Sequence, residues 1–263
     1  MAIAQPPFMA SAKEDICIRK ITLHDLRMAL AQGWNDFLDK RGDLVFIGLI
    51  YPIAVLLGTL YVLNVSILPL IFPIAAGSVL FGPVAASGFY ELARRRELGL
   101  DARWRHFLDV LRGPAAEPLF ALTSVIAGLF MLWILAAWYI NLMTMGTDAP
   151  DTLLAFLQAT LTTPEGWSMI VIGNLVGLGF AIAALAISVI SFPMLIDRPV
   201  SWTVALRTSV RVTWHNPVTI AAWGLIVVGL LVLGAIPALV GLAVVLPVLG
   251  YSTWHLYTLA VER

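Results

Sequence analysis

Charged residues are confined to a few short segments of this chain, and that distribution limits its fold more than any other feature. The apolar stretches at 44–90, 118–147, 166–196 and 212–261 contain no Asp, Glu, Lys or Arg. A membrane span needs about 20 mostly apolar residues to cross a hydrocarbon core ~30 Å thick. Each stretch is long enough, so the sequence predicts an integral membrane protein.

Composition supports the same class. Only 12% of the residues are charged and 60% are hydrophobic, whereas a soluble domain carries about 25% charged residues. The formal net charge is zero, so no basic excess points to nucleic acid as a partner.

The first and last apolar stretches are long enough for two spans each. The former breaks near Asn64–Ser66 and the latter near Gly234–Pro237. We therefore predict an all-α, polytopic protein with a cytoplasmic N-terminal segment, residues 1–43, and a six-helix transmembrane domain, residues 44–263. The expected spans are about 44–63, 68–90, 118–143, 167–196, 217–235 and 239–258.

The basic residues predict the orientation. All 16 Lys and Arg fall in 1–43, 91–117, 197–216 or at Arg263. The loops expected on the other side, about 64–67, 144–166 and 235–238, contain none. By the positive-inside rule both termini are cytoplasmic, and we expect a multi-pass membrane protein.

Tryptophans mark both expected membrane boundaries, where an apolar ring with a polar N–H suits the headgroup level. Trp104, Trp202, Trp214 and Trp254 fall at the cytoplasmic boundary, and Trp138 and Trp167 at the other.

An amphipathic segment precedes each expected pair of spans, at 22–38, 101–112 and 201–214. Thr22 and Asp25 have the spacing of a capping box, and the other two segments start at Asp101 and Ser201. The apolar face of the first consists of Leu23, Leu26, Leu30, Trp34 and Phe37; that of the second of Trp104, Phe107, Leu108 and Leu111; that of the third of Trp202, Ala205, Leu206 and Val210. This pattern predicts three transmembrane hairpins, each with an interfacial helix in the headgroup plane.

Residues for catalysis are missing from the expected spans. The histidines, His24, His106, His215 and His255, lie in cytoplasmic segments or at the cytoplasmic end of the last span, and no pair has the i, i+4 spacing of a helical metal site. Proton relays need ionisable groups inside spans, and here the strongest polar group at depth is Asn174. We expect no enzyme activity, no cofactor and no metal.

Two features are candidate interaction sites. Small residues recur along the fourth span, at Gly173, Gly177, Ala181, Ala184 and Ser188, and such faces let helix backbones approach closely, within the bundle or with another subunit. The second feature is the run Arg94, Arg95 and Arg96 at a helix exit. It acts either as a positive-inside stop signal paired with Glu91 and Glu97, or as a docking site for anionic headgroups or an acidic partner.

Three stretches resemble one protein family. They are 21–26 with 29–37, the run Gly88–Gly99 that reads GFYELARRRELG, and Phe192–Arg198. The chain resembles, over about residues 18–260, a family of bacterial six-span inner-membrane proteins of unknown function. Some members carry the label cytochrome c oxidase subunit. The resemblance brings no catalytic residues, and only an accessory subunit would fit a chain without intramembrane histidines.

Two functions are therefore expected. The first is a non-enzymatic accessory or assembly subunit that associates with a larger membrane complex, such as a respiratory one. The second is a transporter or flippase for an uncharged or lipid-like substrate. A polar-lined cavity near Asn174, open to one side, would favour the second, and a bundle packed solid to its axis would exclude it.

Overall fold

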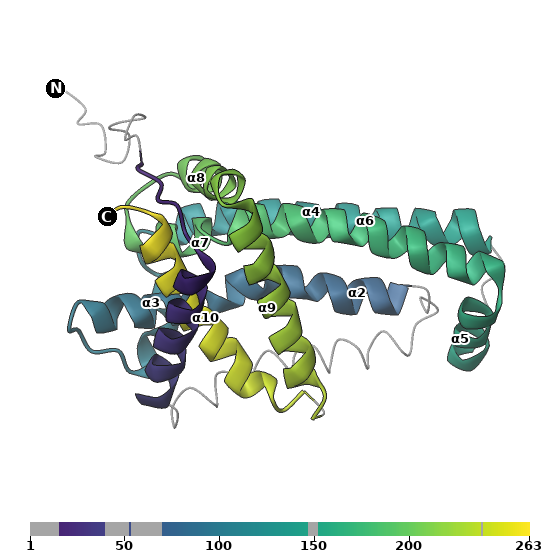
Figure 1. The fold of residues 1–263 in the computed structure, drawn as a ribbon, viewed down its shortest axis with the longest axis horizontal. Coiled ribbons are helices and arrows are strands. Elements are labelled where there is room, and N and C mark those ends of the chain that lie inside the picture. Colours follow the sequence, from purple (N-terminus) through teal and green to yellow (C-terminus); the bar gives the residue numbers. More distant parts are fainter. Residues whose placement is uncertain (1–15, 40–52, 54–69, 147–151, 238) are drawn as a thin grey trace.

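The computed structural model describes residues 16–39, 53, 70–146, 152–237 and 239–263. These residues are almost entirely helical, and their only β contact is one isolated antiparallel bridge between Ile18 and Val261. Figure 1 shows two long helices, α4 and α6, lying side by side, with α9 and α10 crossing the bundle. The all-α, membrane-spanning class is confirmed.

The second expected span, 68–90, consists of three consecutive pieces. They are α2 (Ile71–Ser78), the 3-10 helix η3 (Val79–Phe81) and α3 (Gly82–Glu97). Pro83 lies in the first turn of α3, where its missing N–H costs nothing. The helix continues seven residues past the predicted end and carries the arginine run in its last turn.

The third and fourth expected spans are α4 (Ala116–Met145) and α6 (Pro164–Ser188), the latter followed by α7 (Ser191–Asp197). The segment 144–166, expected to be a loop, contains a further helix, α5 (Leu153–Thr162), and prediction was wrong there. The Thr152 hydroxyl caps α5 by accepting from the Ala155 N–H at 3.3 Å.

The fifth and sixth expected spans are α9 (Pro217–Ala235) and α10 (Leu242–Ala260). Among the described residues, five helical segments are long and apolar enough to cross a membrane. The first expected span, 44–63, and the domain boundary at residue 43 lie outside the described residues apart from Ile53. The six-span, three-hairpin layout therefore stays a prediction.

The helix is interrupted between α6 and α7, and a hydroxyl of a neighbouring helix hydrogen-bonds the backbone at the interruption. Pro193 lacks an N–H, and its ring conflicts with the carbonyl four residues earlier, at Val189. The N–H of Ile190 donates instead to the Ser209 hydroxyl of α8 (Trp202–His215) at 3.2 Å. That hydroxyl donates in turn to the Ala186 carbonyl at 2.7 Å.

Two of the three amphipathic segments are α-helices that begin where the sequence predicts, and the middle one is not. A helix spans residues 23–39, and its predicted capping box is confirmed, with the Thr22 N–H donating to Asp25 at 2.7 Å. The predicted start of α8 at Ser201 is also confirmed, because its hydroxyl accepts from the Val204 N–H.

The segment 101–112 is not an α-helix but the 3-10 helix η4 (Trp104–Leu111). Because residues i and i+3 eclipse in a 3-10 helix, Phe107 and Val110 turn inward while Leu108 and Leu111 stay exposed. The predicted single apolar face is therefore split.

The best buried of the five membrane-length helices is α10, which packs against the helix 23–39, α3 and α9. Gly33 lies so close to α10 that a Cβ there would be 2.6 Å from the Ser252 backbone nitrogen. On the opposite contact, a Cβ on Gly250 would be 2.7 Å from the Phe89 Cβ. These two glycines let α10 sit between its neighbours.

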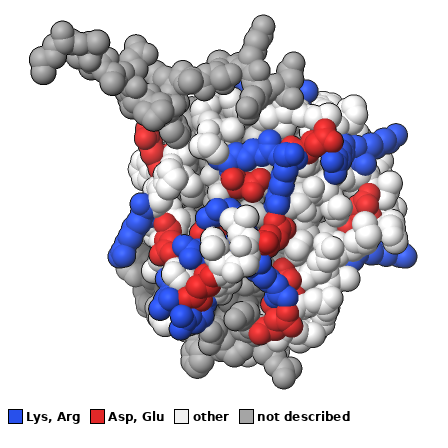
Figure 2. All heavy atoms as spheres, turned by 90° about the vertical axis from the view of Figure 1, so that its left-hand side faces the viewer, with Lys and Arg blue, Asp and Glu red and all other residues white. Residues whose placement is uncertain are grey.

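Charged side chains of both signs are interspersed over one end of the molecule (Figure 2). This charged end comprises the helix 23–39, the last turns of α3, η4, α7, α8 and the C-terminal residues. The tryptophans expected at the two boundaries are exposed at Trp104, Trp138, Trp167, Trp202 and Trp214. Trp254 is instead completely buried in the charged end, so its assignment to an aromatic belt was wrong.

Candidate functional site

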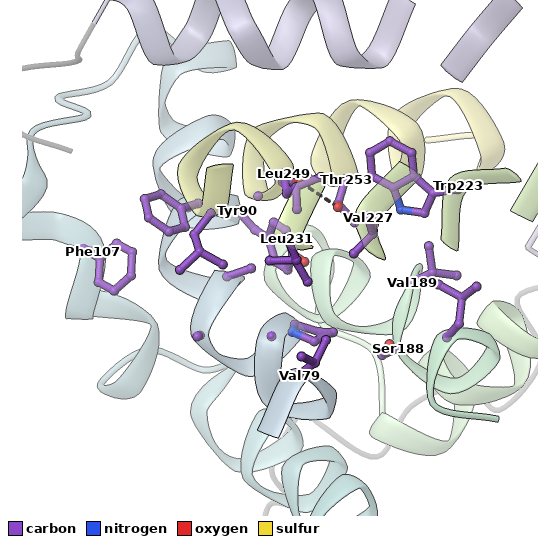
Figure 3. A pocket seen from close by; sticks show the side chains of 18 residues that line it. Val79, Tyr90, Phe107, Ser188, Val189, Trp223, Val227, Leu231, Leu249 and Thr253 are labelled. Carbon is purple, nitrogen blue, oxygen red and sulfur yellow. Dashed lines mark hydrogen bonds between the residues drawn. The ribbon is translucent and has the colours of Figure 1, made fainter. Parts of the chain in front are cut away.

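A crevice of about 310 Å³ opens between spanning helices. It is bounded by η3 and α3, the end of α6, α9 and α10 (Figure 3). A Cβ added to Gly82, which lines the crevice, would meet no atom within 4 Å. The described part of the bundle is therefore not packed solid, so the observation that would have excluded a transporter is not made there.

The lining of the crevice is apolar and uncharged. Its polar side chains are the hydroxyls of Tyr90, Ser188 and Thr253. The Thr253 hydroxyl is satisfied within its own helix, where it donates to the Leu249 carbonyl at 2.7 Å. Such a lining can hold a hydrocarbon chain but offers no partner to a charged group.

Aromatic side chains close the crevice toward the charged end. Phe107 of η4 meets Phe89 edge to face, with ring centroids 4.9 Å apart. The Phe107 ring also covers Gly88, where an added Cβ would lie 2.4 Å from it. Figure 3 shows Phe107 and Tyr90 at one end of the crevice and Trp223 at the other.

The predicted small-residue face on α6 is divided between two environments. Gly177 packs against Trp133 of α4, while Ala184 and Ser188 are buried. Gly173 faces open space, and Ala181 is exposed. Gly177, Ala184 and Ser188 thus pack within the bundle, and the open part of the face consists of Gly173 and Ala181.

A second, more open groove of about 380 Å³ lies at Asn174, between α2, α4 and α6. It is lined by apolar and small side chains, and Asn174 is the only polar residue in its lining. The Asn174 amide nitrogen donates to the Ile170 carbonyl of its own helix at 2.8 Å. A cavity near Asn174 thus exists, but its lining is mostly apolar rather than polar.

The arginine run is engaged in ion pairs with acidic residues of the chain itself. Arg94 pairs with Glu91 through two hydrogen bonds of 2.9 Å, and Arg95 pairs with the same carboxylate at 2.7 Å. Arg96 turns away toward Asp36 and Asp39 of the helix 23–39. The expected pairing with Glu91 is present, and this carboxylate is buried.

Arg95 also ties η4 to α3, because its guanidinium donates to Asp109 at 2.9 Å. Asp109 is further held by the ring of His106 at 2.7 Å, and this hydrogen bond lowers the pKa of the Asp109 carboxyl. The Arg95–Asp109 ion pair therefore holds η4 against α3, and Phe107 of η4 lies at the end of the crevice.

Glu97 was expected to pair with the arginine run and does not. It accepts from the Trp254 indole N–H at 3.0 Å and pairs with Arg263 at 2.5 Å. The Arg263 guanidinium lies 5.0 Å from the centre of the Trp254 ring, within range of a cation–π contact. Glu97 thus connects the last turn of α3 with Trp254 of α10 and with Arg263.

The histidines do not assemble a metal site. His255 of α10 pairs with Asp36 of the helix 23–39 at 2.8 Å, and His106 lies between Asp101 and Asp109. In the described part of the chain, no group of three His, Cys, Asp or Glu side chains is placed to hold a metal ion.

Sequence reasoning named the arginines but missed most of their partners. Glu91 was detectable because it precedes Arg94 and Arg95 at i+3 and i+4. Asp36, Asp39 and Asp109 lie far away in sequence or across a loop, and no local signal connects them to the run.

Comparison with known proteins agrees with this architecture. Residues 71–197 match the family described as predicted integral membrane protein (DUF2189). Over this segment the chain is similar to a family of integral membrane proteins of unknown function, in agreement with its apolar helices of membrane-spanning length. The matched segment runs from the start of α2 to the end of α7 and includes the arginine run, but it is shorter than the resemblance noted over 18–260. No curated protein and no solved structure matches the chain.

Proposed function

We propose that this protein is a non-enzymatic membrane protein that binds an uncharged, lipid-like molecule in the apolar crevice, as a transporter or flippase for such molecules would. The crevice carries this proposal, because it lies between helices long enough to span a bilayer and has no charged side chain in its lining.

The size of the crevice limits what it holds. Ligand sites generally enclose about 300–1,000 Å³, and this one encloses about 310 Å³. A single hydrocarbon chain or a small ring system fits that space, whereas a complete two-chain phospholipid does not. The Ser188 hydroxyl offers a hydrogen bond to an uncharged polar end, whereas the Tyr90 hydroxyl is already bonded to Thr253.

Filling the crevice tests the proposal. Ala86 lines it, and Ala86→Phe places a ring in the space that the ligand would occupy. The matched control is Ala221→Phe on the exposed surface of α9. Both variants are purified in a mild detergent, and the apolar lipids retained per mole of protein are measured by mass spectrometry.

We expect Ala86→Phe to lose a lipid species that the wild-type protein and Ala221→Phe both retain. Equal lipid content in all three proteins would contradict the proposal. Thermal unfolding of the purified variants checks that each is folded.

A second candidate function is the accessory or assembly subunit of a larger membrane complex, such as a respiratory one. The open half of the α6 face favours it, because Gly173 faces free space beside the groove at Asn174. A helix of another subunit could approach closely at Gly173, and its polar groups could bond the Asn174 amide.

A pull-down of tagged protein in mild detergent tests this candidate, with Gly173→Leu as the variant that blocks the groove. We expect a partner that co-purifies with the wild-type protein and is lost from the variant. Recovery of the wild-type protein alone, at monomer mass, would contradict the candidate.

A further inference from the structure

A polar hollow of about 430 Å³ lies at the charged end, separate from the apolar crevice. We call it the interfacial hollow. It is bounded by the last turns of α3, η4, the loop before α4 and the end of α7. Arg94, Arg95 and Arg198 line it together with Glu91, Asp109 and Asp197.

The interfacial hollow lies at the depth of lipid headgroups. The span that contains α3 ends at Glu97, α4 begins at Ala116, and the span that contains α7 ends at Asp197. Three ends of apolar spans therefore meet around the hollow. By the orientation predicted from the basic residues, this boundary faces the cytoplasm.

Two of the three arginines have a guanidinium nitrogen that makes no hydrogen bond within the described residues. Arg95 uses all three nitrogens, on Glu91, Asp109 and the Asp101 carbonyl. Arg94 uses Nε and Nη2 on Glu91, and Arg198 uses Nη2 on the Glu262 carbonyl. Within the described residues, Nη1 of Arg94 and Nη1 of Arg198 make no hydrogen bond.

Each carboxylate of the hollow is paired. Glu91 holds Arg94 and Arg95, and Asp109 holds Arg95 and His106. Asp197 accepts from the Tyr257 hydroxyl at 2.6 Å and lies 3.4 Å from Arg263 and 3.6 Å from Nε of Arg198. These pairs occupy one edge of the Arg94 and Arg198 guanidinium groups and leave Nη1 of each for a ligand.

The start of α4 adds positive potential at the same place. Residues 113–115 and Pro118 line the hollow, and no side chain caps this end of the 30-residue helix. The Ala116 N–H already donates to the Gly113 carbonyl at 3.0 Å and Pro118 has no N–H, so the contribution here is that of the helix dipole, which favours an anion and is partly offset by Glu117 in the same turn. This contribution adds to that of the two guanidinium groups.

We propose that the interfacial hollow binds the phosphate group of a membrane phospholipid through Arg94 and Arg198. Arginine suits the task because its planar guanidinium matches phosphate oxygens. The position at the ends of three spans favours a lipid headgroup over free phosphate as the source. Arg95 and Arg96, which the sequence suggested for the same role, serve the fold instead.

Native mass spectrometry of the full chain in detergent tests this site. Phosphatidylglycerol is titrated against diacylglycerol with the same acyl chains, which lacks the phosphate. The variants are Arg94→Gln and Arg198→Gln, and the matched control is Arg207→Gln, an exposed arginine of α8 outside the hollow. Because Arg198 does not pair with Glu91, Arg198→Gln tests the site without disturbing that cluster.

The wild-type protein and Arg207→Gln should prefer phosphatidylglycerol. Both hollow variants should bind it about tenfold more weakly, the factor that corresponds to ~1.4 kcal/mol. Diacylglycerol binding should not change, and Arg198→Lys should recover part of the loss. Unchanged phosphatidylglycerol binding in a folded Arg198→Gln variant would overturn the proposal.

A competition arm separates the two sources of phosphate. Millimolar inorganic phosphate should leave phosphatidylglycerol bound if a lipid is the ligand. Displacement of the lipid by inorganic phosphate, together with phosphate binding to lipid-free protein, would overturn the lipid assignment in favour of a soluble phosphate. Neither arm depends on whether the apolar crevice is filled.

Discussion

The helices α4 and α10 are both apolar enough to cross a membrane, yet they differ in burial. Only six of the 30 residues of α4 are buried, against 13 of the 19 residues of α10. Their mean hydropathies differ in the opposite sense, 2.3 for α4 and 1.2 for α10. Lipid demands apolar side chains, whereas protein neighbours can satisfy polar ones. The less apolar span is therefore the central one.

The same contrast separates the two ends of the molecule. At the charged end, buried Glu91 accepts hydrogen bonds from arginines of its own helix, and buried Trp254 of α10 donates one to Glu97 of α3. Along α4, side chains such as Leu135 and Trp138 are more than half exposed. We therefore expect substitutions around α10 and the charged end to affect stability far more than those on α4.

The largest effect should follow Glu91→Gln. The substitution leaves Arg94 and Arg95 without their shared carboxylate, and removing one partner of a buried ion pair costs about 3–5 kcal/mol. The control is Glu165→Gln in the exposed first turn of α6, where the loss should be about 1 kcal/mol or less. Unfolding in mixed micelles measures both, and equal losses would break the contrast between the ends.

A matched pair of leucines tests the contrast between the two helices. Leu256 of α10 is fully buried, and Leu135 of α4 is 57% exposed. Leu256→Ala should cost about 2–5 kcal/mol in the free energy of unfolding. Leu135→Ala should change it by about 0.5 kcal/mol or less. A larger loss at Leu135 would mean that α4 is covered by protein.

A smaller effect is expected where α10 approaches the helix 23–39. Gly33→Ala places a Cβ 2.6 Å from the Ser252 nitrogen, and overpacking of this kind costs about 1–3 kcal/mol. Gly179→Ala is the control, because a Cβ there meets no atom within 4 Å and alanine favours a helix. The control should be neutral or stabilising. Two neutral variants would show that the helices are not in close contact.

The smallest effect is a pH dependence at the joint between η4 and α3. The hydrogen bond with His106 lowers the pKa of Asp109, so its carboxylate stabilises the fold above the unfolded value of about 3.9. This stabilisation is lost as the pH falls through the lower folded value. Between pH 6 and 3, Asp109→Asn should therefore remove part of the acid-induced fall in thermal stability. An identical fall in both proteins would exclude Asp109 as a contributor.

Much of this architecture could be read from the sequence. The ends of α9 and the starts of α4 and α8 follow directly from charge, proline and capping residues such as Ser201. The short helix α5 was missed within a segment expected to be a loop. The 3-10 character of η4 was missed because Trp104, Phe107, Leu108 and Leu111 have the spacing of an α-helical face. Burial of Trp254 was also missed, since a tryptophan near a span end suits the headgroup level equally well.

The candidate sites were less accessible to sequence reasoning than the spans. The arginine run was found, but its division between Glu91 and the helix 23–39 depends on contacts between residues up to 60 positions apart. The crevice has no sequence signature, because its apolar lining comes from six separate elements and resembles any other set of span residues.

The central claim is that the apolar crevice holds a hydrocarbon chain as a site, whereas the outer surface of α4 only touches bulk lipid. A photoreactive fatty acyl chain tests this most directly, added at increasing concentration to the reconstituted protein and followed by mass spectrometry of labelled peptides. Labelling of the crevice residues of α3 and α10 should saturate and be competed by unlabelled lipid, while labelling of α4 should rise in proportion to concentration. Proportional labelling of all three helices would contradict the account.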